Sequence, residues 1–260
     1  MPAPYVMSGH GRPVTALVTG ASRGIGLAFV RHLAATGVAR RVWAGCRHPD
    51  SAGALATLAA EHDKVRPLAL DVTDEDSLAA AAGGIGAEGE PLDLVINCAG
   101  LLHRPDGPQP ERRLDEVRAD WLLESFAVNG AGPLLLAKHV EPLLPRRERA
   151  VFASLSARVG SISDNRLGGW YAYRGAKAAQ NMFLKTLSIE LARRARGAIC
   201  VALHPGTTDT ELSRPFQGGV PEAKLFSPAR SADQLLRVID RLTRADSGRF
   251  YAWNGERIDW

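Results

Sequence analysis

The amino-acid sequence predicts an α/β protein in which a doubly wound parallel sheet of about seven strands carries helices on both faces. Short apolar runs alternate with longer segments of helical periodicity along nearly the whole chain, and this alternation is typical of a parallel sheet that is covered on both sides. The chain shows no linker, low-complexity tract or internal repeat. We therefore expect one domain over residues 1–260, with residues 1–13 as a flexible N-terminal extension.

The expected elements follow one another in a regular order. The first strand is expected at residues 14–19, and a glycine-rich turn leads from it into a helix with apolar positions at Leu27, Val30 and Leu33. Further strands are expected at residues 41–46, 65–70, 92–97, 149–154, 198–203 and 250–253. Helices are expected between them at residues 52–61, 74–83, 114–144, 171–193 and 227–243, the third with an interruption near residues 130–133.

A second glycine-rich stretch, at Gly83, Gly84 and Gly86, follows a helical pattern and precedes a strand. A phosphate-binding loop has the opposite order, with a strand before the glycines and a helix after them. We therefore interpret this stretch as the end of a helix and its turn.

The turn after the first strand contains three glycines in the pattern Gly-x-x-x-Gly-x-Gly, which departs from the commoner Gly-x-Gly-x-x-Gly. Gly20 and Gly24 allow a tight turn and the close approach of a phosphate group, while Gly26 allows the helix to pack near the strand. The start of the helix adds free N–H groups and the positive end of its dipole. Dinucleotide contacts are expected at Gly20, Ser22, Arg23, Gly24, Ile25 and Gly26.

Tyr173 and Lys177 lie four residues apart in an expected helix, so their side chains share one face. An ammonium group beside a phenol stabilises the phenolate, which would make the tyrosine a usable acid or base near neutral pH. Such a spacing is common on exposed helices. Its combination with the glycine-rich turn makes the pair a candidate catalytic pair.

Together these motifs resemble the short-chain dehydrogenase/reductase family from about Val14 to the C-terminus. Further matches follow in the family's order at Asn97-Cys-Ala-Gly100, at Asn129 within Val-Asn-Gly, and at Pro205-Gly206. Residues 158–173 and 247–256 are most similar to the C-factor and sniffer-type carbonyl reductase branch. The resemblance implies a Rossmann-type fold and hydride transfer between a nicotinamide cofactor and a small carbonyl or alcohol substrate.

The resemblance also implies roles for three residues. Tyr173 would donate a proton to the developing alkoxide, because carbonyl reduction needs an acid beside the reacting carbon. Lys177 would lower the pKa of that phenol and hold the nicotinamide ribose, and Asn129 would position a water molecule that links Lys177 to solvent.

The family's fourth catalytic residue is a serine three positions before a glycine, and here the pattern departs. Gly160 is preceded at that distance by Ala157, with Ser156 one residue earlier and Ser161 directly after the glycine. Ser156 is our first candidate for the hydrogen bond to the substrate oxygen and Ser161 is the alternative. A purely structural serine turn remains open for both.

Two basic residues favour NADP(H), with NAD(H) as the alternative. Arg47 follows the second expected strand, where a carboxylate would hold an unmodified ribose, and Arg23 lies in the glycine-rich turn. Both guanidinium groups can bind a 2′-phosphate. By resemblance, the remaining cofactor contacts are Asp71, Val72, Asn97, Ala99, Gly100, Pro205, Gly206, Thr208 and Thr210, together with Tyr173 and Lys177. Asp71 is equally open to a role as a helix N-cap.

Composition argues against several other functions. The net charge of +4 comes with basic clusters at expected helix ends or in loops, where cations favour the helix dipole, so no nucleic-acid partner is expected. Three cysteines without a Cys-x-x-Cys pair predict reduced thiols, and seven histidines without paired spacing predict no metal site. No apolar run approaches the roughly 18 residues of a membrane span. We expect a cytoplasmic protein that does not bind membranes.

Residues 207–227 are rich in Pro and Gly, so they are expected to form a lid over the substrate, with His103 and Arg104 as further candidates for substrate contact. The resemblance implies a homodimer or homotetramer that pairs through the helices near residues 114–144 and 171–193. The expected function is NADPH-dependent carbonyl reduction. The alternative is a dinucleotide-binding signalling or sensor protein of the C-factor type, with incidental or no turnover.

Overall fold

The computed structural model describes residues 9–260, so the first eight residues of the expected N-terminal extension lie outside the described residues. Its central sheet contains eight strands. In chain order they are β1 Val14–Thr19, β2 Ala39–Cys46, β3 Val65–Ala69, β4 Leu94–Asn97, β5 Ala150–Leu155, β6 Ala198–His204, β9 Arg249–Ala252 and β10 Arg257–Ile258. Two short strands, β7 Thr207–Thr208 and β8 Leu225–Phe226, form a separate pair.

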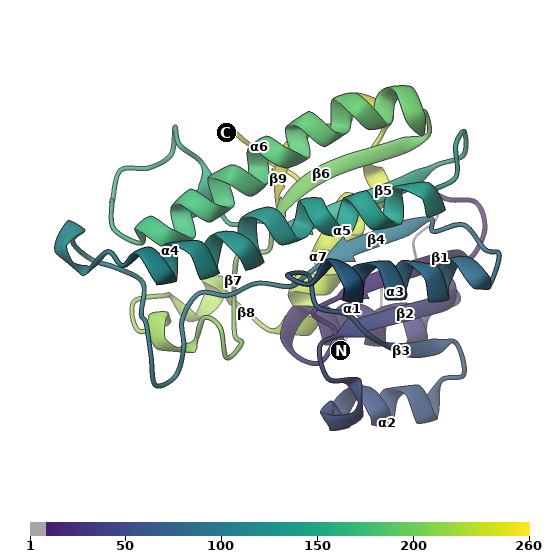
Figure 1. The fold of residues 1–260 in the computed structure, drawn as a ribbon, viewed down its shortest axis with the longest axis horizontal. Coiled ribbons are helices and arrows are strands. Elements are labelled where there is room, and N and C mark those ends of the chain that lie inside the picture. The colour runs from purple at the N-terminus through teal and green to yellow at the C-terminus, as the bar shows by residue number, and fades with distance from the viewer. Residues whose placement is uncertain (1–8) are drawn as a thin grey trace.

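The strands of the main sheet stand in the order β10-β9-β6-β5-β4-β1-β2-β3. Seven of them run parallel to one another (Figure 1). The eighth, β10, pairs antiparallel with β9 at one edge. The order reverses direction between β1 and β4, which is the topological switch point where ligands bind in doubly wound sheets. The expected fold class is confirmed, with β10 as an additional strand that the sequence pattern did not predict.

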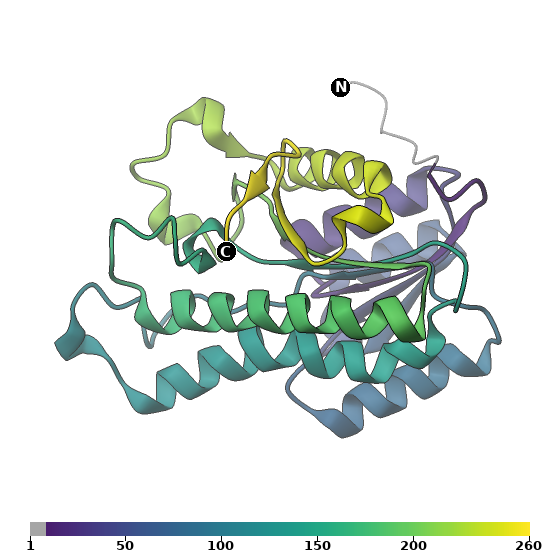
Figure 2. The same ribbon diagram turned by 90° about the horizontal axis from the view of Figure 1, so that it is seen from above.

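Helices cover both faces of the sheet. They are α1 Gly24–Ala35, α2 Gly53–Glu61, α3 Glu75–Ala87, α4 Ala119–Ser125, α5 Gly132–Val140, α6 Tyr171–Arg194 and α7 Pro228–Arg241. The apolar sides of α1, α2 and α7 pack into one core, and those of α3, α5 and α6 pack into a second core on the opposite face (Figure 2). None of the helices within residues 9–260 combines the length and apolar character that a membrane crossing requires.

The interpretation of Gly83, Gly84 and Gly86 as a helix end is wrong, because α3 continues through all three glycines to Ala87. Ile85 is 1% exposed and packs into the core on the face of the sheet that α3, α5 and α6 cover. A side chain on Gly86 would press against Leu143 at 3.2 Å. Core packing of the residue between the glycines therefore outweighs their low helix propensity of about 1 kcal/mol each.

The single long helix expected at residues 114–144 is divided. A 3₁₀ turn at Leu114–Glu116 comes first, α4 and α5 follow, and the π-helical turn Phe126–Ala131 joins these two helices. The expected interruption near residues 130–133 therefore begins earlier, at Phe126. Such π turns insert one extra residue per turn and re-aim the side chains that they carry, and they are frequent at functional sites.

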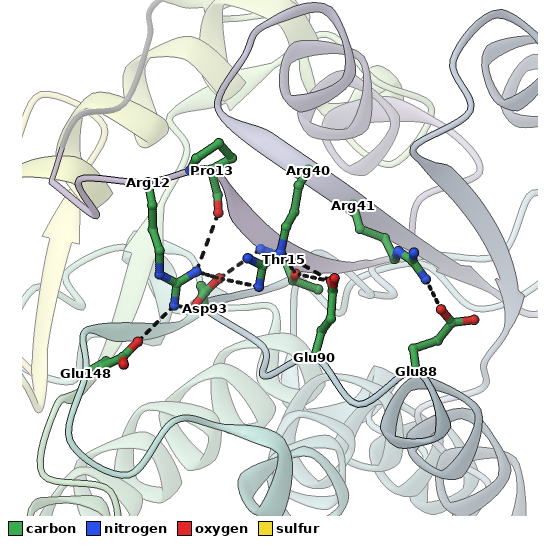
Figure 3. Close-up of polar contacts among 9 residues, drawn as sticks. All are labelled: Arg12, Pro13, Thr15, Arg40, Arg41, Glu88, Glu90, Asp93 and Glu148. Atoms are coloured by element: carbon green, nitrogen blue, oxygen red, sulfur yellow. Dashed lines mark hydrogen bonds and ion pairs between the residues drawn. The ribbon is translucent and has the colours of Figure 1, made fainter.

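A charged cluster ties the N-terminal segment to the amino ends of the central strands (Figure 3). The side chain of Asp93 is fully buried and accepts hydrogen bonds from both terminal nitrogens of Arg12, at 2.9 and 2.7 Å, and from the backbone N–H of Thr15 at 2.9 Å. Arg40 lies 3.9 Å from the same carboxylate, and exposed Glu148 also contacts Arg12 at 3.0 Å. The carboxylate thus joins the segment before β1 to the start of β4.

Candidate functional site

A cavity of about 900 Å³ opens at the carboxyl ends of the parallel strands. Twenty different residues are proposed for the site, and sixteen of them line this cavity. They are Gly20, Ser22, Arg23, Gly24, Ile25, Gly26, Arg47, Asp71, Val72, Ala99, Gly100, Ser156, Tyr173, Lys177, Pro205 and Thr210. The structure therefore gathers segments from six different strand ends around one space.

The glycine-rich turn has the geometry of an anion cradle. Gly20 and Gly24 adopt φ values of +64° and +56°, which residues with a side chain rarely adopt. A Cβ atom on Gly26 would lie 2.2 Å from the carbonyl oxygen of Gly20. No side chain caps the N-terminus of α1, so its first N–H groups are available to a phosphate group. These features fit the pyrophosphate of a dinucleotide.

Two arginines lie on the rim of the cavity at its glycine-rich end. Arg23 forms an ion pair with Glu211 of the expected lid at 3.1 Å, and both side chains are largely exposed. Arg47 has no ion-pair or hydrogen-bond partner among residues 9–260. A ligand anion can therefore approach its guanidinium group without displacing a carboxylate.

Asp71 also lines the cavity, and its carboxylate accepts hydrogen bonds from the backbone N–H and the hydroxyl of Thr73, at 2.9 and 2.7 Å. The N-cap of α3 is Asp74, whose carboxylate accepts from the N–H groups of Asp76 and Ser77. The alternative that Asp71 is the N-cap is therefore wrong, and Asp71 shapes the turn at the cavity edge.

Tyr173 and Lys177 lie on the first turns of α6, with the ammonium nitrogen of Lys177 5.7 Å from the centre of the Tyr173 ring. Lys177 is 2% exposed, and its Nζ atom donates hydrogen bonds to the carbonyl oxygen of Leu155 and to Oε1 of Gln180, both at 2.8 Å. Burial lowers the pKa of Lys177 to about 7. Burial also raises the pKa of Tyr173, and in this arrangement it is the dominant influence on the phenol.

Asn129 lies in the π-helical turn and is fully buried. Its Oδ1 atom accepts from the N–H of Leu101, and its Nδ2 atom donates to the carbonyl oxygens of Leu101 and Ser125. The side chain thus fastens the loop after β4 to this helix. It does not line the cavity, and its expected role in positioning a water molecule stays a prediction.

The structure separates the two candidate serines. Ser156 lines the cavity and its hydroxyl donates to Oδ1 of Asn181 at 2.7 Å. The amide orientation of Asn181 is set by its second bond, from Nδ2 to the carbonyl oxygen of Gly160. Ser161 lies away from the cavity and donates to the backbone oxygen of Asp259 at 2.6 Å. Ser161 therefore has the contacts of a structural residue that holds the C-terminal segment.

Three other proposed cofactor contacts, Asn97, Gly206 and Thr208, are not among the residues that line the cavity. Asn97 is fully buried and accepts from the Thr19 hydroxyl at 2.6 Å. The hydroxyls of Thr208 and Ser231 lie 2.7 Å apart, and Gly206 has a φ of +74° against the ring of Phe226. Their expected contacts with the cofactor stay a prediction.

An aromatic cluster beside Tyr173 was not expected. The ring of Trp170 lies 6.3 Å from that of Tyr173 and 5.0 Å from that of Phe216, which belongs to the lid segment. His103 contacts the same Phe216 ring at 5.7 Å. Trp170 has a φ of 54°, a left-handed conformation that is strained for a side chain of this size. The signal in the sequence that could have placed Trp170 at the site is its position three residues before Tyr173.

Gln180 was also missed. It lies three residues after Lys177, on the same face of α6, and is fully buried. A long polar side chain at an inward-facing position near a candidate lysine is the signal that could have found it. No group of three or more His, Cys, Asp or Glu side chains in residues 9–260 is arranged to hold a metal ion.

The chain is similar to known proteins over most of its length. A family model described as short chain dehydrogenase matches residues 14–219. A 1-hydroxy-2-glutathionyl-2-methyl-3-butene dehydrogenase from Rhodococcus sp. (strain AD45) is 34% identical over 249 residues, which cover 95% of this chain and 99% of that protein. The C-signal protein of Myxococcus xanthus is 35% identical over 170 residues, which cover 65% of this chain and 93% of that protein.

Solved structures show the same likeness. An NADPH-bound carbonyl reductase from chicken fatty liver has a TM-score of 0.84 and 34% identity, with coverage of 96% of this chain and 100% of that one. The carbonyl reductase Sniffer of D. melanogaster has the same TM-score and coverage at 28% identity.

Proposed function

The chain belongs to the short-chain dehydrogenase family, and from that membership we propose that it is an NADPH-dependent carbonyl reductase acting on small ketones, aldehydes or quinones. The observation that carries this proposal is the position of Tyr173 and Lys177 on the wall of the cavity that the glycine-rich turn also lines. The NADPH-bound structural relative supports the choice of cofactor.

The chain's own residues would divide the work as follows. The uncapped N-terminus of α1 holds the pyrophosphate, and Arg47 binds a 2′-phosphate. Bound there, NADPH supplies the hydride. Tyr173 donates the proton that the carbonyl oxygen needs, and the ammonium of Lys177 favours the resulting phenolate through its positive charge. The lid segment and its aromatic contacts limit the access of water to this space.

NADPH consumption over a panel of ketones, aldehydes and quinones tests the proposal. A glutathione-conjugated alcohol with NADP⁺ belongs in the panel for the reverse direction, because the Rhodococcus relative carries such a substrate in its name. Saturable turnover with at least one compound is expected. Tight NADPH binding with no turnover on the whole panel would contradict it.

That negative result would instead favour the second candidate, a dinucleotide-binding sensor. Two observations support this candidate: the similarity to the C-signal protein, and the alanine at position 157 combined with a Ser156 hydroxyl that already donates to Asn181. The presence of both Tyr173 and Lys177 on the cavity argues for turnover.

Replacement of Arg47 by aspartate is expected to weaken NADP(H) binding about ten- to a hundredfold and to change NAD(H) binding little. A charge-assisted hydrogen bond to a phosphate is worth roughly 1.5 to 3 kcal/mol, and a carboxylate would repel the phosphate. Fluorescence titration with both cofactors measures the two affinities. Arg196→Asp, at an exposed position outside the cavity, is the control. Equal affinity of the unmodified protein for NADH and NADPH would contradict the assignment.

Ser156→Ala is expected to lower the rate of reduction by at least about tenfold, whereas Ser161→Ala stays within a few fold. A single hydrogen-bond donor to a developing oxyanion typically contributes more than about tenfold to the rate. We expect a smaller effect for Ser156, because its hydroxyl must give up its bond to Asn181 before it can reach a substrate. Steady-state kinetics on the best substrate compare the two variants. The reverse ranking would transfer the role to Ser161, and two near-normal variants would remove it from both.

We also propose that the protein forms a homodimer or homotetramer through α4 and α6, which lie side by side along one face of the molecule (Figure 2). Leu123 on α4 and Met182 on α6 are 70% and 64% exposed, which is high for side chains of this kind. Light scattering should report a molar mass that is a multiple of the 27.8 kDa chain mass. Met182→Glu should lower the measured molar mass, because it places a charge in the proposed interface. A mass near that of one chain at micromolar concentration would refute the assembly.

A further inference from the structure

A continuous chain of polar side chains is buried behind the cavity wall. The hydroxyl of Thr19 on β1 donates to Asn97 at the end of β4, and Asn97 Nδ2 donates to the Ser154 hydroxyl on β5 at 2.9 Å. The same Ser154 oxygen accepts from Nε2 of Gln180 at 2.9 Å, and Gln180 contacts Lys177. All five side chains are at most 2% exposed. Three neighbouring strands thus reach Lys177 through hydrogen bonds that are shielded from water.

Gln180 is the last link, and every polar atom of its amide is used. Oε1 accepts from Lys177 at 2.8 Å, while Nε2 donates to Ser154 and, at 3.2 Å, to the carbonyl oxygen of Leu155. The reversed amide would turn its two N–H groups toward an ammonium that has only donors. The hydrogen bonds therefore permit one orientation of the amide.

Lys177 has three N–H donors when protonated. Leu155 and Gln180 accept two of them, each at 2.8 Å. One donor is left for the cavity that Lys177 lines. Two acceptors at fixed positions define where the third donor points, and Gln180 is the one of the two that a substitution can remove.

We propose that Gln180 is a positioning residue that holds the ammonium group of Lys177 on the cavity wall for the proposed reduction. The proposal rests on the proposed reductase function. The contact between Gln180 and Lys177 can nevertheless be tested without turnover. Gln180 touches neither Tyr173 nor the cavity in the structure. It therefore acts through Lys177.

The electrostatic consequence has a definite sign. Burial lowers the pKa of Lys177 to about 7, and the amide oxygen of Gln180 opposes this effect because its negative end faces the ammonium. The titratable groups that face Lys177 are Cys98, at the end of β4, and Tyr173 on α6. Removal of the amide oxygen should lower the pKa of Lys177 further, and a carboxylate in its place should raise it.

The experiment is a pH titration of ¹³C-lysine-labelled protein by NMR, without cofactor. The chain contains five lysines, so the Lys177 signal can be assigned from its loss in Lys177→Met. Gln180→Met, which keeps the length of the side chain, should lower the Lys177 titration midpoint by about one pH unit, and Gln180→Glu should raise it by about one unit. Because the two shifts are opposite, each variant tests the proposal even where the other does not fold.

Gln234→Met and Gln234→Glu are the matched controls, since Gln234 lies on α7, which covers the opposite face of the sheet. They should leave the Lys177 midpoint unchanged. Unchanged midpoints in both Gln180 variants, or shifts in the same direction, would overturn the proposal. In the active enzyme, the pH above which turnover falls should move in the same order as the midpoints. Shifted midpoints with an unshifted activity profile would overturn the role in reduction while leaving the proposed reductase activity intact.

Discussion

Replacement of Tyr173 by phenylalanine is expected to slow carbonyl reduction at least about a hundredfold while NADPH still binds. The substitution removes the proton donor, and general acid catalysis typically contributes this much to a rate. The ring itself stays, so its edge contact with Trp170 at 6.3 Å is retained. Single-turnover oxidation of bound NADPH measures the chemical step, and a fluorescence titration measures cofactor affinity.

Tyr171→Phe provides the matched control. Tyr171 lies two residues earlier, is 42% exposed, and has Gly175 rather than a cation four residues further along. Its variant should retain near-normal turnover. A Tyr173→Phe protein that turns over as fast as the Tyr171→Phe protein would assign the proton donor to another group.

Replacement of Asp93 by alanine is expected to lower the free energy of unfolding by about 3 kcal/mol, or more than a hundredfold in the folding equilibrium. The substitution removes the acceptor of two Arg12 hydrogen bonds and leaves the buried backbone N–H of Thr15 without a partner. The loss stays below that of a fully buried ion pair, because Arg12 is 36% exposed and can be hydrated. Urea denaturation measures the change from the midpoint and slope.

Glu148→Ala is the control for this prediction, because it removes the other carboxylate that contacts Arg12. Glu148 is 69% exposed, and exposed ion pairs contribute little to stability. Its variant should therefore lose much less than Asp93→Ala. Equal losses in the two variants would mean that burial of the Asp93 carboxylate does not determine the strength of this cluster.

The positions of the helices and strands could be predicted wherever a hydrophobic pattern coincided with a single helix or strand. The strands β1, β5 and β6 are short, mainly apolar runs that are buried almost throughout, and they begin and end within a residue or two of the expected bounds. β10 has two residues and carries no pattern of its own, since it forms by pairing with β9. The end of α3 was predicted too early because glycine has a low helix propensity, and the sequence did not show that Ile85 between the glycines would be buried.

Cavity residues could be predicted where a short motif fixes the backbone. The glycine spacing sets a turn, and the spacing of four residues places Tyr173 and Lys177 on one helical face. Spacing does not distinguish a residue that lines the cavity from one directly behind it. Asn97 and Thr208 follow the same strand ends as the lining residues but lie in the second layer, where other polar side chains occupy them.

The fold class, the order of its elements, and the turn and helix that carry the site were therefore accessible from the chain, because each depends on residues that are close in sequence. The hydrogen-bond partners could not be predicted from the sequence. The bonds of Ser156 to Asn181 and of Gln180 to Ser154 join residues 25 and 26 positions apart on different elements. Which side chain is buried, and which donor meets which acceptor, depends on how α6 packs against β5, and that packing is a property of the folded sheet as a whole.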